Sequence, residues 1–217
     1  MQQKTLLIGS AVLLILAFVG GALVYNAQKS EDEARAAGRN RSLLVRMHSP
    51  GLGKSDAKVH IVEFFDPACG TCKAFYPFVK NLMAANPNRV KLSLRYAPFH
   101  DGSDSVVKML EAARKQGKYW EALEAVLASQ EMWAVNHKAQ PQLVLKLLGG
   151  IGLNIEKLKR DMNAPEIAAV IAQDVADARA LKVKATPEFF VNGRPMPSFG
   201  YDQLKNLVET ALADAYR

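Results

Sequence analysis

The stretch from Val59 to Cys72 reads VHIVEFFDPACGTC, and it decides the fold of this chain. Its first seven residues are almost continuously apolar, which is typical of a strand buried on both faces of a sheet. Asp66-Pro67 ends the apolar run, and two cysteines separated by Gly70-Thr71 follow at once. The pattern predicts a central strand that passes directly into a helix, with both cysteines at the start of that helix.

Other strands and helices are predicted on either side of this stretch. Apolar residues at helical spacing indicate a helix after the cysteines, kinked at Pro77 and ended by the turn at 86–88. Residues 90–96 alternate between apolar and polar and predict a half-covered strand, and residues 43–47 predict a short edge strand. Strand, helix and strand in succession around a buried run are typical of an α/β domain.

The second half of the chain is predicted to be helical before it returns to strand. Apolar stripes across residues 103–181 predict several helices. Residues 189–191 predict a strand, Asn192-Gly193 is a strong hairpin signal, and Pro195 confines the second hairpin strand to a sheet edge. A last amphipathic helix is expected around residues 204–212. The α/β domain should therefore contain a helical insertion.

The N-terminal segment has the length of a membrane span. Residues 5–28 carry no charge, and Leu6 to Tyr25 is a run of 20 largely apolar residues. As a helix rising about 1.5 Å per residue, this run spans a hydrocarbon core of about 30 Å. We expect a retained anchor; the alternative is a cleaved signal peptide, whose apolar region is usually shorter, about 7–15 residues. Polar residues 26–40 are predicted to form a tether, and the Lys and Arg residues in and beyond it favour a body on the inner side.

The composition is that of a globular protein. Hydrophobic residues make up 49% and charged residues 23% of the 217, and the formal net charge is +7. Lys and Arg nowhere form a dense block, which argues against nucleic-acid binding. The two cysteines are too few for a disulfide-stapled scaffold or a four-cysteine zinc site. About 175 residues follow the N-terminal segment, enough for one sizeable core.

The two cysteines are predicted to form a redox-active pair. A helix N-terminus presents free N–H groups and a partial positive charge, and both favour a thiolate at Cys69. Cys72 follows three residues later on the same helix face, close enough to close a disulfide. Cys69 would then form a mixed disulfide with a substrate, and Cys72 would resolve it.

Two other uses of the cysteines stay open, a bare structural disulfide and half of a metal site. A zinc site would need two further ligands from carboxylates or histidines, and no pair of cysteines or histidines is suitably spaced to supply them. Copper(I) would suit the thiolates. We expect no metal and no cofactor besides the Cys69–Cys72 disulfide. The histidines are His48, His60, His100 and His137.

Glu63, six residues before Cys69 in the apolar strand, is a candidate proton acceptor. Burial should raise its pKa, so that it can take the proton of Cys72; the alternative is a carboxylate at a wet edge of the sheet. Lys73 would favour a nearby anion or simply be solvated. Thr186-Pro187 opens the penultimate strand, but only about 5–6% of X-Pro bonds are cis, so physics alone does not single it out.

At these residues the chain resembles a known family. VEFFDPACGTC, the helix with Pro77, and KATPEFFVNG are together similar to the DsbA-like branch of the thioredoxin superfamily, and the similarity covers residues 43–217. The resemblance implies an α/β, thioredoxin-like fold with an inserted all-helical domain, preceded by one N-terminal transmembrane helix.

The resemblance also implies roles for individual residues. Cys69 would be the nucleophile, Cys72 the resolving thiol and Glu63 the buried acid. A cis Thr186-Pro187 bond would lie beside Cys69, with the Thr186 backbone pairing with an extended substrate. Gly70-Thr71 departs from the Pro-His of the strongest oxidants in the family, so Cys69 is expected to be less acidic and the protein a milder oxidant.

A location and an organisation follow from the same resemblance. The catalytic domain would lie on the periplasmic side of a bacterial inner membrane, on a single-pass anchor, because oxidised cysteine pairs persist in an oxidising compartment. We prefer this placement to the inner-side location that the Lys and Arg residues near the apolar segment favour. The expected segments are an anchor or signal sequence (1–28), a linker (29–40), a thioredoxin-like part with the CxxC (41–101), a helical insertion (102–181) and a second thioredoxin-like part (182–217).

The implied function is thiol:disulfide exchange with exported proteins, with disulfide formation as the favoured direction. The alternatives are an isomerase or reductase of the same fold, or a non-catalytic peptide-binding or copper-handling module. The expected partners are exported cysteine-containing proteins and a membrane redox partner, either a quinone-linked oxidase or a transmembrane reductant. No nucleic acid is expected, and a monomer is the default.

Overall fold

The structure is a computed structural model that describes residues 2–136 and 138–217. A five-stranded sheet forms the centre of the body, with its strands in the order β1-β3-β2-β6-β7. β2 and β3 run parallel, and the other neighbouring pairs in this sheet are antiparallel. The strands are β1 (Gly51–Leu52), β2 (Val59–Phe65), β3 (Val90–Tyr96), β6 (Glu188–Val191) and β7 (Arg194–Pro195).

Strand β2 is central because β3 and β6 cover its edges and helices cover both of its faces. Successive side chains on a strand point to opposite faces. Ile61 packs in the main core with side chains of α2 and α9, whereas Val62 and Phe64 pack in a second cluster with the end of α1 and with α8. Glu63 therefore points to the α2 face. These helices are α1 (Gln2–Leu44), α2 (Gly70–Ala85), α8 (Pro165–Ala180) and α9 (Tyr201–Ala215).

The predicted strands match the structure closely. Residues 59–65 and 90–96 form β2 and β3, and α2 follows the first of them. The turn between β6 and β7 has positive φ at Asn192 (49°) and Gly193 (88°), as a type I′ hairpin turn requires. β7 lies at the sheet edge, so Pro195 removes no hydrogen bond from a central strand.

The insertion between β3 and α8 is mostly helical, but the expectation that it is all-helical is wrong. Two short strands, β4 and β5, pair with each other there. They flank Asn136, whose φ of 52° is the left-handed conformation of a tight turn. Apolar periodicity cannot detect strands of two residues. The elements are α3 (Ser103–Arg114), α4 (Tyr119–Ala128), α5 (Gln130–Trp133), β4 (Ala134–Val135), β5 (Lys138–Ala139), α6 (Pro141–Gly149) and α7 (Ile155–Asp161).

The N-terminal helix is longer than expected, and two predictions about this region are wrong. α1 continues unbroken to Leu44, so residues 26–40 are helical rather than a loose tether. Residues 43–47 form no strand, because Leu44 ends the helix and is buried, and β1 is the edge strand instead.

The side chains of the expected tether support this helix. Arg35 lies 2.9 Å from Asp32 and 3.7 Å from Glu31, and ion pairs at three- and four-residue spacing favour helix. Their effect is small because all three side chains are exposed. The alanines of this segment add helix propensity.

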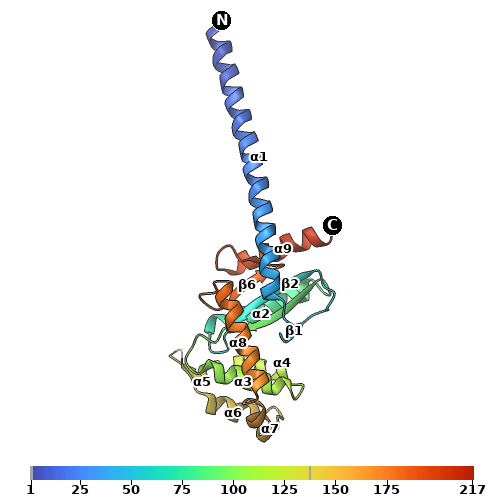
Figure 1. The fold of residues 1–217 in the computed structure, drawn as a ribbon, viewed down its shortest axis with the longest axis vertical. Coiled ribbons are helices and arrows are strands. Elements are labelled where there is room, and N and C mark those ends of the chain that lie inside the picture. Colours follow the sequence, from blue (N-terminus) through green and yellow to red (C-terminus); the bar gives the residue numbers. More distant parts are fainter. Residues whose placement is uncertain (1, 137) are drawn as a thin grey trace.

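The part of α1 from Leu13 to Leu44 contains a stretch that is long and apolar enough to cross a membrane, judged by length and composition. That stretch is not buried in the body, and a signal sequence would pass the same test. Figure 1 shows α1 leaving the body as a single helix, with the N-terminus at one end of the molecule and the helical insertion at the other.

Candidate active site

Cys69 is placed at the start of α2 by the turn that follows β2. The backbone N–H of Cys69 donates to the Asp66 carbonyl oxygen, and the N–H of Lys73 donates to the Cys69 carbonyl oxygen in the first helical turn. The residue is buried, with 6% of its surface exposed. Cys69 and Cys72 are both free thiols in the structure.

The environment of Cys69 favours its thiolate. A hydrogen bond from the Cys72 side chain lowers the pKa of Cys69 most, and bonds from the Thr186 side chain and the backbone of Cys72 and Thr71 lower it further. Desolvation opposes these bonds but does not outweigh them, so the pKa falls to about 5. Donors gathered around one sulfur are what a helix start provides.

Cys72 behaves in the opposite way. It is fully buried, and desolvation raises its pKa well above the usual value; the hydrogen bond with Cys69 and the charge of Glu63 raise it further. One sulfur of the pair is therefore held as a thiolate and the other as a thiol. This asymmetry is the arrangement that thiol–disulfide exchange requires.

Glu63 is buried on the same face of β2 as α2, so the alternative of a wet sheet edge is wrong. The residue is 1% exposed, and neither carboxyl oxygen has a hydrogen-bond partner among the described residues. Desolvation raises the pKa of Glu63 to about 8, with a further contribution from the charge of Cys69. A buried carboxyl without a partner is costly, and such groups gather at functional sites.

Thr186 and Pro187 lie beside Cys69, although 117 residues separate Thr186 from it in the chain. The peptide bond between them is cis, as the family resemblance implied. The Cys69 Sγ lies 3.1 Å from the carbonyl oxygen of Thr186, which accepts a hydrogen bond from Cys69 while that sulfur is protonated. β6 begins one residue after Pro187 and pairs with β2, and this register brings the two segments together.

Sequence reasoning missed Gln130, which comes from α5 of the insertion. Its buried side-chain amide donates to the carbonyl oxygens of Pro67 (2.8 Å) and Cys69 (3.0 Å). The insertion therefore holds the active-site turn directly. No pattern in the sequence marks this glutamine among the polar residues of a helical block.

Sequence reasoning also missed the role of Asp66 in shaping the turn. Its buried carboxylate accepts hydrogen bonds from the backbone N–H groups of Ala68, Phe99 and His100, and it lies 2.8 Å from the His100 ring. An Asp-Pro pair at the end of a strand is a known turn signal that would have pointed to it. Lys73, in contrast, makes an exposed ion pair with Glu131 at 2.7 Å.

The histidines considered as metal ligands lie in different places. His48 contacts Asp174, His60 contacts Ser93, and His100 contacts Asp66, while His137 lies outside the described residues. Burial lowers the pKa of His60 to about 4, and the cations Lys91 and Arg41 lower it further. Among the residues described, no three His, Cys, Asp or Glu side chains are grouped so that they would hold a metal ion.

The comparisons with known proteins agree with this geometry. A family model described as thioredoxin matches residues 46–210. The chain belongs to the thioredoxin family. Within that family it is similar to DsbA-like oxidoreductases of the BdbD type, and the fold expected from the sequence is confirmed.

Individual members of the thioredoxin family resemble the chain over most of its length. A thioredoxin-like oxidoreductase from Silicibacter pomeroyi is 37% identical, with a TM-score of 0.68, over 78% of this chain and 95% of that one. Oxidised BdbD from Bacillus subtilis is 27% identical, with a TM-score of 0.66, over 76% and 93%. A probable disulfide bond formation protein D from Bacillus anthracis is 25% identical over 97% and 98%.

Some relatives are much longer proteins. The chain is 28% identical over 142 residues to the Na(+)/H(+) antiporter NhaA of Herminiimonas arsenicoxydans, and the match covers 65% of this chain. It spans only 22% of that relative and 24% of two further antiporters of the same name. The similarity to these proteins therefore concerns a part of each.

Proposed function

We propose that this protein is a thiol:disulfide oxidoreductase that forms disulfides in exported polypeptides through Cys69 and Cys72. The observation that supports this most strongly is the opposite behaviour of the two sulfurs. The pKa of Cys69 is lowered to about 5, while that of Cys72 is raised. A stabilised thiolate in the reduced form makes the corresponding disulfide easier to reduce, and hence a better oxidant.

The proposed reaction begins from the Cys69–Cys72 disulfide. A substrate thiolate attacks the Cys69 sulfur, the bond between the two cysteines breaks, and Cys72 leaves with the electron pair. Glu63 is protonated below its pKa of about 8 and gives its proton to Cys72. A second substrate thiolate then attacks the substrate sulfur of the mixed disulfide, and Cys69 leaves as a stabilised thiolate. The substrate is oxidised by two electrons and the enzyme is reduced.

In the reverse direction Glu63 accepts the proton of Cys72, which can then resolve the mixed disulfide. Thr186 is the proposed substrate-binding position, because its carbonyl oxygen lies 3.1 Å from the Cys69 sulfur, just before the cis bond to Pro187. An extended substrate that pairs with this backbone segment would bring its own sulfur to Cys69.

The proposed location rests on the family resemblance, which implies an exported body, and on α1, which is long and apolar enough to anchor it. The body would lie on the outer side of a bacterial inner membrane, with α1 as its anchor. Turnover requires that electrons leave the reduced enzyme, so we retain a membrane redox partner as part of this proposal. Exported proteins that contain cysteines would be the substrates.

The test of the chemistry is covalent trapping. Cys72→Ser removes the resolving thiol, so mixed disulfides through Cys69 should accumulate in cells and dissolve on reduction. Cys69→Ser is the matched control and should trap nothing. Recovery of no adducts with Cys72→Ser, from a protein that is folded and exported, would contradict the proposed function.

The test of direction is the reduction potential in glutathione buffers. Lowering the nucleophile pKa from about 7, as in thioredoxin, to about 5 stabilises the reduced form at pH 7 by about 2 kcal/mol, or roughly 50 mV. We therefore expect a potential near −220 mV, starting from about −270 mV for thioredoxin. A value below that of thioredoxin would contradict disulfide formation and favour a reductase.

A further inference from the structure

The end of α1 is fixed to the turn of the β6–β7 hairpin. Ala37 is buried, and a Cβ at Gly193 would clash with the Ala37 carbonyl oxygen, so only glycine allows this approach. The Asn40 side chain donates to the Gly193 carbonyl oxygen at 3.0 Å. One turn of the helix is thus in direct backbone contact with the sheet.

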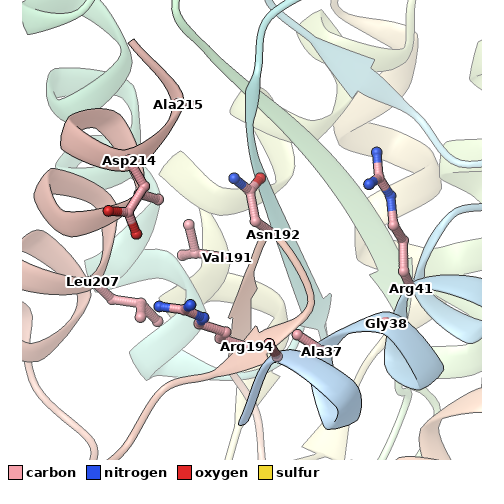
Figure 2. Close-up of a pocket in the computed structure, with 11 residues that line it drawn as sticks. Ala37, Gly38, Arg41, Val191, Asn192, Arg194, Leu207, Asp214 and Ala215 are labelled. Carbon is pink, nitrogen blue, oxygen red and sulfur yellow. The ribbon is translucent and has the colours of Figure 1, made fainter. Parts of the chain in front are cut away.

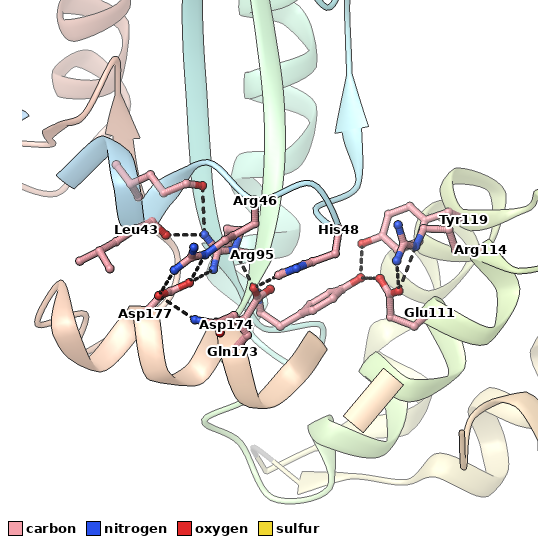
Figure 3. Close-up of polar contacts among 12 residues, drawn as sticks. Leu43, Arg46, His48, Arg95, Glu111, Arg114, Tyr119, Gln173, Asp174 and Asp177 are labelled. Atoms are coloured by element: carbon pink, nitrogen blue, oxygen red, sulfur yellow. Dashed lines mark hydrogen bonds and ion pairs between the residues drawn. The ribbon is translucent and has the colours of Figure 1, made fainter. Parts of the chain in front are cut away.

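The last residues of α1 are fixed a second time by Arg95 of β3. Leu44 is 1% exposed and packs with Val62 and Phe64 on the face of β2 opposite to α2. The Arg95 guanidinium donates to the carbonyl oxygens of Leu43 (2.7 Å) and Leu44 (3.0 Å), and Figure 3 labels Arg95 and Leu43. Carbonyls at a helix C-terminus lack partners within the helix, so this cation caps α1.

Arg95 is itself held rigidly by α8. It is completely buried and contacts Asp174 at 2.7 Å and Asp177 at 2.5 Å. Arg46, two residues beyond the end of α1, makes two hydrogen bonds to Asp177. Figure 3 shows that this network joins the segment after α1 to α8 and β3. Contacts on both sides of the helix end make α1 and the body one unit.

α1 leaves the body at the end of β2 that is far from the cysteines. Ala37 contacts the hairpin turn, where the N–H of Asn192 donates to the carbonyl oxygen of His60 near the start of β2. Leu44 packs on Phe64 near the end of β2. α1 therefore enters at the amino end of β2, whereas Cys69 follows the carboxyl end. Figure 1 agrees, because the helical insertion that contacts Cys69 lies at the end of the molecule opposite to the N-terminus.

The distances that separate the cysteines from the apolar segment are larger than a headgroup layer. Nine residues from Gln28 to Ala37 extend about 13 Å as helix, and four residues from Ile61 to Phe65 extend about 13 Å as strand. The helical part alone places the contact between α1 and the hairpin about 13 Å beyond the end of the uncharged segment, and Cys69 follows the opposite end of β2 from that contact. A headgroup layer is only about 5–8 Å thick.

We infer that α1 is a rigid stalk that holds Cys69 on the side of the body turned away from the membrane. The direct partner of Cys69 is therefore a cysteine-containing polypeptide in solution, not a thiol held at the membrane surface. A membrane redox partner reaches Cys69 only through an exported segment of its own. This inference rests on the proposed function and on α1 remaining as an anchor.

The structure also supplies a reference position on the other side of the body. A cleft of about 400 Å³ lies between α1, the hairpin and the end of α9. Figure 2 shows residues of these three elements around it. Ala34 and Ala37 line it from the stalk, and Asp214 lines it from α9. Asp214 is exposed and hydrogen-bonds to the exposed Arg217, so a cysteine there would mark the membrane-facing side without disturbing the core.

The experiment uses the full chain in lipid vesicles that contain a phosphatidylethanolamine with a maleimide on its headgroup. Cys69 is the only thiol in Cys72→Ser, and Asp214→Cys is the only thiol when Cys69 and Cys72 are both serine. Each rate with the lipid reagent is divided by the rate of the same thiol with a soluble maleimide, which removes differences in reactivity. We expect the ratio for Cys69 to be at least tenfold lower than the ratio for the cysteine at 214.

A second variant tests rigidity alone. Residues 29–36 are replaced by a Gly/Ser sequence of equal length, which leaves the contacts of Ala37, Asn40 and Leu44 in place. The flexible segment should let the body turn toward the bilayer and raise the Cys69 ratio at least fivefold. Equal ratios for Cys69 and the cysteine at 214 in the unaltered stalk, or no rise with the flexible one, would overturn the inference.

The same preparations separate this inference from the proposed function. The vesicle-bound wild-type chain should reduce insulin in the presence of dithiothreitol. Loss of that activity would overturn the proposed function, on which the identity of the partner rests. The maleimide ratios are measured on single-cysteine variants that do not need exchange activity, and they decide the geometry of the stalk.

Discussion

The two faces of β2 bury carboxylates in opposite ways. On one face Glu63 lies beside the cysteines without a hydrogen-bond partner among the described residues. On the other face Asp174 and Asp177 are equally buried, but Arg95, Arg46 and other donors satisfy them, as Figure 3 shows. The same chemical group is thus unpaired on one side of the sheet and fully paired on the other.

This difference in pairing gives the carboxyl groups different roles: Glu63 can carry a proton, whereas Asp174 and Asp177 act as structural charges. Paired carboxylates stay ionised and hold elements together, and breaking such a pair leaves a costly buried charge. An unpaired buried carboxyl has a raised pKa and can exchange a proton near neutral pH. A carboxyl of the first kind should matter mainly for stability, and one of the second kind mainly for the pH dependence of exchange.

The largest effect is expected from breaking the paired side. Arg95→Met should destabilise the body by roughly 3–5 kcal/mol, because Asp174 and Asp177 both lose the buried guanidinium and Asp177 keeps only the partly exposed Arg46. The measurement is urea unfolding of the wild type and the variant. Arg46→Ala, whose side chain is 29% exposed, is the control and should cost far less. If the two variants lost the same free energy of unfolding, the buried pairs of Arg95 would not be the main structural contribution of this network.

Glu63→Gln should have the next largest effect, and of opposite sign. The folded pKa of about 8 lies above the unfolded value, so the wild type loses stability as the pH rises from about 4.5 to 8. Glutamine does not titrate and has no such penalty. The free energy of unfolding of the variant, minus that of the wild type, should therefore be roughly 3 kcal/mol larger at pH 7 than at pH 4.

The same substitution should slow exchange on the order of tenfold or more, because the proton carrier of Cys72 is lost. Unfolding at several pH values and the rate of insulin reduction are the measurements. Glu131→Gln, an exposed glutamate, serves as the control. A variant with the pH profile of the wild type would show that Glu63 does not titrate in this range.

Gln130→Leu tests the contact between the insertion and the active-site turn. The carbonyl oxygens of Pro67 and Cys69 would lose their donor, at a cost of roughly 1–3 kcal/mol. The alkylation rate of Cys69 should change as well, because its turn is no longer held. The adjacent Glu131→Ala alters only an exposed pair and should change neither quantity. Unchanged stability of Gln130→Leu would mean that the insertion does not hold the turn.

The smallest effect is expected from Thr71→His. An imidazole beside Cys69 should lower the pKa of Cys69 below about 5 by up to about one unit, worth about 1.4 kcal/mol. The pH dependence of iodoacetamide alkylation measures this pKa. Thr71→Val adds no imidazole and is the matched control. A wild-type pKa lower than that of Thr71→His would contradict the idea that Gly-Thr makes a milder oxidant.

The part of the fold around the cysteines could be predicted from local sequence. β2 is a continuous apolar run, and Asp66-Pro67 and the cysteines fix where it ends, so strand and helix follow from short-range physics. Glu63 stands out because a charge is rare in such a run. Thr186-Pro187 came from the family resemblance, since no local rule selects one X-Pro bond over another.

The rest could not be predicted because it depends on contacts between distant segments. Gln130 looks like any polar helix residue until the fold brings it to Pro67. The local sequence predicts strand at Leu43 and Leu44, because the burial of Leu44 and the capping by Arg95 depend on distant segments. Tertiary contacts overrode local propensity there.

The capping of α1 by Arg95 has a practical consequence for producing a soluble fragment. The thioredoxin family match begins at residue 46, which invites truncation at that point. Such a fragment would leave the Arg95 guanidinium without two acceptors and uncover the patch that Leu44 shields. A truncation that starts near residue 30 would keep the last turns of the helix, and it is the version to express.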